Sequence, residues 1–486
     1  MTRVLKNIGI NPASSGIIYA LLIVGLLSMV YSLIMQQWYF FIGTVFCPLV
    51  LITLLYAVKK PMFSYFLFGA ITCYFSAIYR YLGIQGLSII MDILVAFCLF
   101  SIIMNQIVNH ESYPLKKGFN LLTIFQFIWV SYCFLILITP YATLQNFIED
   151  RGLYFTLPLT YILSGMLLCD SKLLKNTILL FGFYVLMAAF KAYWQKRRGF
   201  DSTEIKFLLE DGGYSTHVLR TGMRYFSFFT DAGNFGACMG LFTIAFGIIA
   251  TAAKKPIFKI FSLGVAVAAF GGMMLSGTRG AMIVPLAGLA LYLLLSKNFT
   301  RIIVAAIVGA SIFSFFYFTD IGDDNVFIKR MRTAFRPNKD ASFSVRLENQ
   351  KRFAYYLADK PFGMGVGGKV VDVRKLRTVD EEFIATDSFF VGVWVEGGIV
   401  GLCLYISMLV LLLLRCCYLL MFKIRNKQLR QILVALLCAV FGVWVNGYVG
   451  RCMEFQPGMF TIAVFLSFVL NGQSIDRKLG KDEIII

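Results

Sequence analysis

The sequence predicts an all-α, polytopic integral membrane protein, expected to form a single membrane domain over residues 1–486. The chain is 59% hydrophobic, with a mean hydropathy of +0.76. Many windows hold close to twenty apolar residues, the length that lets a helix cross a hydrocarbon core. Helices satisfy their own backbone polar groups in lipid, and these runs are too long for the strands of a membrane barrel.

The apolar runs predict about 14 transmembrane helices, within a range of about 12–14. They are placed near residues 16–35, 38–58, 62–79, 86–104, 119–139, 153–169, 177–194, 233–253, 257–275, 280–295, 301–318, 388–414, 430–449 and 457–471. The first run follows Arg3 and Lys6 and lacks a small-residue cleavage site. We therefore interpret it as a first helix and not as a removed signal peptide.

Charge alternates along the connections between these spans. Every second connection, beginning with the N-terminal segment, carries at least two Lys or Arg. The short connections between them carry only Arg80, Arg151, Arg279 and Arg451, at most one in each. Because cytoplasmic loops are rich in Lys and Arg, both termini are predicted to be cytoplasmic. Two long loops, 195–232 and 319–387, are then extracytoplasmic, and much of the net charge of +19 faces anionic lipid without any need for nucleic acid.

The Cys and His residues argue against a metal centre. Most of the eleven Cys lie inside apolar runs, where Cys acts as a small hydrophobe, and no Cys-x-x-Cys occurs. With only His110 and His217 in the chain, a His-based metal site is not expected. No cofactor is predicted, and His217 is interpreted more readily as an ordinary loop residue than as a catalytic base.

The first long loop ends in HVLRTGMRYFSFFTDAGNFG, in which Arg220 and Arg224 precede an aromatic run and Asn234 begins the next span. Arg carries a fork of donors suited to diphosphate, although a single Arg can also snorkel at the interface. The Phe side chains of the run could stack on sugars or lie in an interfacial aromatic belt.

The second long loop is the longest polar stretch, and from Lys329 to Arg352 it holds eight Lys or Arg against two acids. Ser344 is predicted to cap a helix that runs to about Leu357. Within that helix Arg352 can pair with Glu348 at i,i+4 spacing.

Arg346 lies off the face of the Glu348–Arg352 pair and stays available for a ligand. The following GMGVGG could cradle phosphate through backbone N–H groups, or it could form the turn that ends the helix. It lacks the Lys-Ser/Thr of a P-loop, so an ATPase is not expected.

Four segments together resemble the O-antigen ligase/polymerase superfamily of bacterial envelopes. They are RYFSFFTDAGNFG, SGTRGA, SVRLENQKRFAYYLADKPFGMGVGG and DSFFVGVWVEGGIVGL. The resemblance covers roughly residues 220–405, with the motifs in the family's order. It implies a GT-C-like, metal-independent membrane glycosyltransferase of the bacterial inner membrane. The donor would be a glycan on undecaprenyl diphosphate at the periplasmic face, and the acceptor another glycan or lipid A-core.

The resemblance also assigns roles to individual residues. Arg279 and Arg346 are implied to be catalytic, together with Asp387, which occupies the position where ligases carry His. The implied substrate-binding residues are Arg220, Arg224, Asn234 and Arg352. Asp387 could act as a general base, or it could cap the helix that starts at Ser388.

The absence of that His favours a surface-polysaccharide polymerase over a ligase. A lipid-linked oligosaccharide flippase is a further alternative, for which Asp92 within a span would suit ion coupling, although it could equally bond to a neighbouring helix. The long outer loops and the lack of an internal repeat argue against a flippase. A non-catalytic envelope assembly protein also remains open.

Overall fold

The computed structural model describes residues 28, 31, 35, 38–84, 86–139, 144–210, 212–219, 222–297, 299–332, 335, 341–366, 370–371, 384–386, 388–480 and 483–486. Most of the predicted span 16–35, and the predicted site residues Arg220 and Asp387, lie outside these residues. The chain divides into two compact units. One comprises residues 1–66 and 97–112, and the other residues 67–96 and 113–486.

The first unit holds α3 (Trp38–Lys59), the start of α4 (Pro61–Leu82) and most of α5 (Ser88–Val108). Polar side chains of α5 bond to the last turns of α3. Ser101 Oγ donates to the carbonyl of Ala57 at 2.7 Å, and Asn105 Nδ2 donates to that of Val58 at 2.6 Å. These bonds give the polar side chains of α5 and the last carbonyls of α3 hydrogen-bond partners, which lipid cannot supply.

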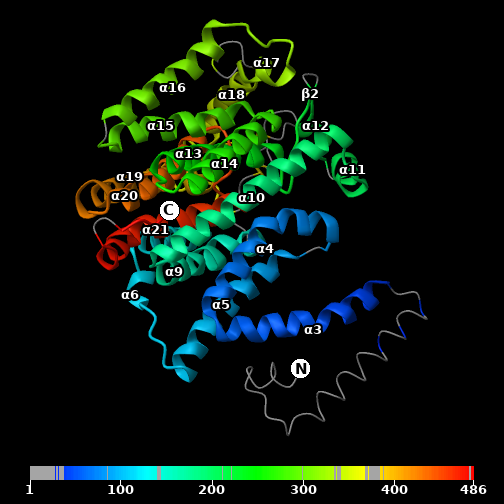
Figure 1. The fold of residues 1–486 in the computed structure, drawn as a ribbon. Helices are drawn as coiled ribbons and strands as arrows, with labels where there is room; N and C mark the ends of the chain where they lie inside the picture. The colour runs from blue at the N-terminus through cyan, green and yellow to red at the C-terminus, as the bar shows by residue number, and fades with distance from the viewer. Residues whose placement is uncertain are drawn as a thin grey trace. The chain divides into compact units, whose positions relative to one another are not determined.

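The second unit contains the remainder of the chain (Figure 1). Its first half comprises α6 (Leu115–Gly118), α7 (Leu121–Leu135), η2 (Ile136–Ile138), α8 (Leu144–Glu149), η3 (Gly152–Thr156), α9 (Leu157–Leu167), α10 (Ser171–Arg198), α11 (Ser202–Leu209), α12 (Tyr214–His217), β1 (Val218–Leu219), β2 (Gly222–Met223) and α13 (Ala232–Ala252). There follow α14 (Pro256–Leu275), η4 (Arg279–Met282), α15 (Ile283–Leu295), α16 (Phe299–Phe318), α17 (Val326–Arg332), α18 (Ala341–Tyr356), β3 (Val370–Val371), β4 (Ile384–Ala385), α19 (Phe389–Tyr418), η8 (Leu419–Lys423), α20 (Lys427–Asn446) and α21 (Gly458–Lys478).

Helices dominate the described residues, which confirms the all-α, polytopic class. Nine of the described helices are long and apolar enough to cross a membrane, and four shorter apolar helices cover 49–59, 152–167, 279–295 and 302–318. Each predicted span from 38–58 onward coincides with a helix. The total of about 14 spans and the GT-C-like architecture stay predictions.

Helices α13, α20 and α21 form the centre of the second unit. In an apolar 18-residue segment of each helix, 83%, 83% and 78% is buried inside the protein. Glycine lets α15 and α20 approach closely. A Cβ at Gly442 would lie 2.2 Å from the carbonyl oxygen of Val284, and one at Gly288 would lie 2.7 Å from that of Cys438. The backbones therefore touch where larger side chains would separate the two helices.

Contacts between connections define two opposite faces of this unit. On one, Arg80 Nη2 donates to the carbonyl of Phe229 at 2.6 Å, and Asn446 Nδ2 donates to that of Gly280 at 2.8 Å. The first bond joins the connection of Arg80 to the first long loop, and the second joins the connections of Arg279 and Arg451. The pairing agrees with the alternation that the charge pattern predicts; that this face is periplasmic stays a prediction.

The opposite face joins the connections rich in Lys and Arg. Lys117 Nζ donates to Ser474 Oγ at 2.6 Å, and Gln428 Nε2 donates to the carbonyl of Ala252 at 3.1 Å. The basic connections thus lie together, as expected for a cytoplasmic surface over anionic lipid.

Candidate functional site

The turn that carries Arg279 is tightly built. Between α14 and η4 the chain passes through Ser276, Gly277 and Thr278, and Gly277 has φ +57°, a value that favours glycine. Ser276 Oγ accepts a hydrogen bond from the Thr278 amide at 3.1 Å. Half-buried Arg279 follows as the first residue of η4. The small residues of the motif therefore fix the backbone from which Arg279 projects.

Arg224, from the first long loop, clamps this turn. Its Nη2 donates to Thr278 Oγ1 at 2.7 Å, and its Nε donates to the carbonyl of Ser276 at 3.3 Å. A third bond runs from Nη1 to the carbonyl of Thr216 at 2.8 Å. Because a guanidinium has five N–H donors, two remain for a ligand. Arg224 therefore positions the turn that carries Arg279. The sequence predicted a different role for Arg224, substrate binding, and that role stays a prediction.

The electrostatic surroundings of Arg224 include two further arginines. Burial lowers the pKa of Arg224, Asp231 raises it, and the positive charges of Arg279 and Arg346 lower it further. Arg279 and Arg346 therefore both lie within electrostatic reach of Arg224, although the three residues come from a turn, α18 and a loop. We call them the arginine cluster. Like charges gathered in this way attract an anion, and guanidinium forks match the geometry of phosphate oxygens.

Arg346 presents an unsatisfied donor. It lies on α18, half-buried, and its buried Nε has no hydrogen-bond partner in the described part of the chain. Arg352 pairs with Glu348 at 3.7 Å, which confirms the predicted i,i+4 contact. The N-cap predicted at Ser344 is wrong, because α18 already begins at Ala341.

Asn234 is engaged by the protein. It is only 3% exposed, and its Nδ2 donates to Thr230 Oγ1 at 2.9 Å and to the carbonyl of Gln456 at 3.0 Å. Asp231 caps the same helix by accepting from the amides of Gly233 and Asn234 at 2.6 and 2.9 Å. Asn234 thus secures the start of α13, and a contact with substrate stays a prediction.

The N-cap of α19 is Ser388, so the interpretation of Asp387 as the N-cap of this helix is wrong. Ser388 Oγ accepts from the amide of Val391 at 3.4 Å and donates to the carbonyl of Gly447 at 3.0 Å. Asp387 lies outside the described residues, so its assignment as a base stays a prediction.

The glycine turn after α18 docks onto a kink in α19 and is not an open phosphate cradle. The amides of Met364 and Gly365 donate to the carbonyls of Val395 and Glu396 at 2.8 and 3.0 Å. At the kink, Gly398 has φ +66°, and a Cβ there would lie 2.0 Å from the carbonyl oxygen of Pro361.

Gly401, one turn after the kink, serves a different contact. A Cβ at Gly401 would lie 2.8 Å from Cε1 of Tyr132 on α7, whose hydroxyl donates to the carbonyl of Gly397 at 2.5 Å. The Pro-x-Gly-x-Gly segment after α18 and the Glu-x-Gly-x-x-Gly segment of α19 therefore pack against each other. This contact holds α18, which carries Arg346, against α19.

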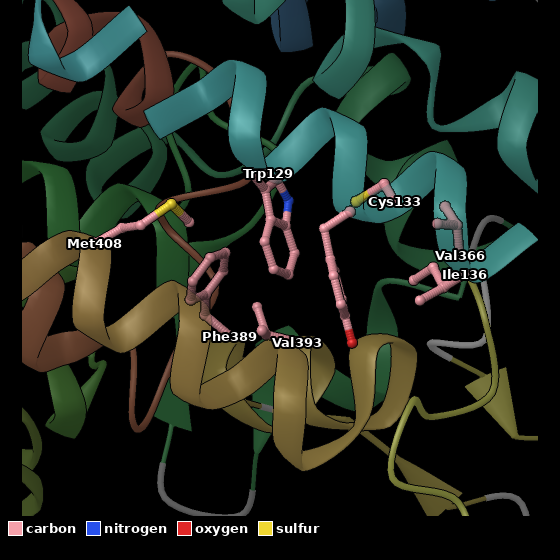
Figure 2. Close-up of a cluster of buried hydrophobic side chains, with 8 residues drawn as sticks. Trp129, Cys133, Ile136, Val366, Phe389, Val393 and Met408 are labelled. Atoms are coloured by element: carbon pink, nitrogen blue, oxygen red, sulfur yellow. The ribbon is translucent and has the colours of Figure 1, made fainter. Parts of the chain in front are cut away.

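A buried apolar cluster joins α7 to α19 (Figure 2). Trp129 and Cys133 on α7 face Phe389 and Val393 on α19. Val366, within GMGVGG, belongs to the same cluster. Between membrane helices such side chains stabilise through close van der Waals packing, so the cluster fixes α7 against α19 beneath the turn.

The connection between α20 and α21, residues 447–457, together with the adjoining Asn446 contacts three motif-bearing elements, and we call residues 446–457 the hub. Asn446 holds Gly280, next to Arg279. The carbonyl of Gly447 accepts from Ser388 and from the amide of Phe389, the latter at 2.9 Å. Sequence reasoning missed the hub, because its only marker was Arg451, one of four isolated arginines.

The aromatic run and His217 form a small core, so both the sugar-stacking and the aromatic-belt interpretations of Phe226 and Phe229 are wrong. These two side chains are 0% exposed. His217, 2% exposed, accepts the amide of Ala232 on Nε2 at 3.2 Å and bonds through Nδ1 to the carbonyl of Gly213 at 2.9 Å. Burial lowers the pKa of His217, which favours the neutral ring. His217 therefore braces the loop.

Asp92 bonds to a neighbouring segment, the second of its two predicted roles. It forms an ion pair with Arg151 at 2.7 Å and accepts from Thr156. This structural use removes the feature that favoured ion coupling in a transporter.

The family comparison agrees with this geometry. Residues 264–406 match the family model described as O-Antigen ligase. The matched segment contains the Arg279 turn, α18 and the kinked start of α19. Searches of curated proteins and of solved structures found no significant match. Over residues 264–406 this chain is therefore similar to the O-antigen ligase family, which supports the resemblance to the O-antigen ligase/polymerase superfamily.

Proposed function

We propose that this protein transfers a glycan from undecaprenyl diphosphate to an acceptor glycan at the periplasmic face, as a surface-polysaccharide polymerase. The observation that carries the proposal is the arginine cluster. The charges of Arg279 and Arg346 both act on the buried Arg224, and Asp231, the acid that acts on it among the described residues, is occupied in capping α13. The unpartnered Nε of Arg346 adds a buried donor that an anion would satisfy.

The proposed reaction is a displacement at C1 of the donor sugar. An acceptor hydroxyl oxygen forms the new bond to C1, while the bond from C1 to the diphosphate oxygen breaks and leaves its electron pair on the diphosphate. Arg279 and Arg346 stabilise the charge that develops there, and preorganised cations of this kind lower the barrier. Asp387 takes the hydroxyl proton as general base. Fixed guanidinium charge makes the step metal-independent, which predicts activity that survives a metal chelator.

The second candidate is an O-antigen ligase with lipid A-core as acceptor. It is favoured by the description of the matched family. Against it stands Asp387 in place of the ligase His. The two are separated by a gene deletion examined as a glycan ladder on a gel. Loss of a polymerase leaves single repeat units on the acceptor, whereas loss of a ligase leaves long chains on the carrier lipid.

The arginine clamp is tested by Arg279→Ala and Arg346→Ala in cells that lack the native gene. Each is expected to lower glycan transfer about 100-fold or more, the usual cost of removing one charge-stabilising donor. The matched control is Lys351→Ala, an exposed cation on the same helix as Arg346. Insertion is checked by the yield of folded protein in the membrane fraction. Full transfer in both arginine variants would refute the clamp.

A further inference from the structure

Two cavities adjoin in the second unit. The first is apolar, encloses about 90 Å³ and is walled by Trp129, Phe389 and Val393 of the cluster in Figure 2. The second encloses about 310 Å³, and we call it the acidic pocket. It is lined chiefly by Asp150, Leu153, Arg451, Glu454, Phe455 and Met459. Leu153, Glu454 and Met459 line both, so the two spaces share a wall.

Glu454 offers a buried acceptor to these spaces. Its side chain is 10% exposed, and its Oε2 accepts from Nε and Nη2 of Arg451 at 2.9 and 2.5 Å. No donor among the described residues bonds to Oε1. That oxygen lies 3.8 Å from a Cβ placed on Gly392, at the wall of α19. The Glu454 side chain is mostly withdrawn from water, so a ligand hydroxyl that donates to Oε1 would be favoured there.

The acidic lining of this pocket disfavours the donor diphosphate. The lining holds the carboxylates of Asp150 and Glu454, and its guanidinium, Arg451, is bonded to Glu454. An anion would therefore be repelled here and attracted to the arginine cluster. The lining instead suits a neutral ligand with hydroxyl donors and an apolar face, because carboxylates accept from hydroxyls and Phe455 and Met459 offer apolar contact. Sugars combine these properties.

The acidic pocket lies on the hub. Arg451, Glu454 and Phe455 belong to the connection whose neighbouring residue, Asn446, bonds to Gly280 beside Arg279. The carbonyl of Gly450, next to Arg451, accepts from the amide of Phe389 at the start of α19, at 3.1 Å. One connection thus links the acidic pocket to the turn that carries a cluster arginine.

We propose that the acidic pocket binds a sugar residue of the acceptor glycan through Glu454 and Asp150, which rests on the proposed transfer reaction. The donor and the acceptor are then sorted by charge. The diphosphate goes to the arginine cluster and the uncharged sugar goes to the carboxylates.

The test is photo-crosslinking of the full chain in cells that make the native polysaccharide. Phe455 is replaced by the photoreactive p-benzoylphenylalanine, and the purified chain is stained for periodate-sensitive glycan after illumination. We expect a glycan adduct at this position. Phe422, an exposed aromatic residue on the basic face, serves as the control position and should give none.

A second arm adds Glu454→Gln, or Asp150→Asn separately, to the crosslinking variant. Either is expected to lower the adduct at least about tenfold, because a hydrogen bond to a charged acceptor is lost. Monodisperse elution of the purified chain shows that the fold is kept. Absence of sugar at Phe455, an adduct with lipid alone, or an adduct undiminished in both carboxylate variants would overturn the proposal.

Activity of Arg279→Ala distinguishes the two levels of inference. Lost transfer in Arg279→Ala with no glycan at Phe455 contradicts the acidic pocket alone. Glycan at Phe455 with unchanged transfer in Arg279→Ala contradicts the arginine clamp and leaves the pocket in place as a glycan site.

Discussion

Gly398→Ala tests the docking of the glycine turn on the kink of α19. The native φ of +66° disfavours any residue with a Cβ, at about 1–2 kcal/mol. The new Cβ would also lie 2.0 Å from the carbonyl oxygen of Pro361, which is backbone and cannot rotate away. The turn must therefore move off the helix.

Three hydrogen bonds depend on that contact. They are Met364 N to Val395 O at 2.8 Å, Gly365 N to Glu396 O at 3.0 Å and Val400 N to Pro361 O at 3.2 Å. At about 1 kcal/mol each, their loss adds about 3 kcal/mol to the backbone strain. Local opening should become easier by about 4–5 kcal/mol, which corresponds to roughly a thousandfold in amide exchange where the native state protects by that much.

Hydrogen–deuterium exchange of the purified protein in detergent measures this effect, read on peptides that cover 360–366. We expect fast exchange there in Gly398→Ala, together with reduced glycan transfer, because α18 loses its anchor. Gly264→Ala is the matched control: it lies inside α14, and nothing within 4 Å would meet its Cβ. Equal protection in both variants would refute the docking argument.

Three further predictions concern polar contacts of the site and its surroundings. Arg224→Lys is expected to lower glycan transfer about 10–100-fold by releasing Thr278, since Lys cannot replace the forked bonds; unchanged exchange at the Thr278 amide would contradict this. Asp92→Asn should lower the free energy of unfolding by about 1–3 kcal/mol through the orphaned Arg151 while sparing transfer, as measured by thermal melting and the glycan ladder. Burial lowers the pKa of His217 below the unfolded value of about 6.5, so its contribution to loop stability is full above that pH and is lost as pH falls. Proteolysis of the first long loop should accelerate between pH 7.5 and 5.5, and less so in His217→Gln.

Local patterns in the sequence predicted the helices well. Apolar runs of about twenty residues located each described span. They do so because, in lipid, the backbone N–H and C=O groups must form their hydrogen bonds within the segment itself. The Glu348–Arg352 pair followed from helical spacing alone. The helix start at Ala341 did not, because the stretch DASFS offers several possible capping residues and tertiary packing decides among them.

Tertiary contacts were beyond prediction from one chain. Phe226 and Phe229 looked interfacial because they flank a span, yet both are fully buried. The amides of GMGVGG looked open because nothing in the sequence shows that α19 kinks toward them. In the sequence Arg451 was an isolated cation. The contacts of the hub with Gly280 and Ser388 depend on the fold and could not be predicted.

The two anchors of the second long loop have a practical consequence for engineering. Before the stretch 372–383, the turn at Met364 and Gly365 is bonded to α19, and β3 pairs with β4 across the stretch, Val370 opposite Ala385. After it, Ser388 is bonded to the hub. An insertion in the chain between β3 and β4 is therefore flanked on both sides by these bonds, and each doubling of the connection's length costs about 0.6 kcal/mol. This stretch is the place for an epitope or a fluorescent domain that reports on the enzyme without displacing Arg346.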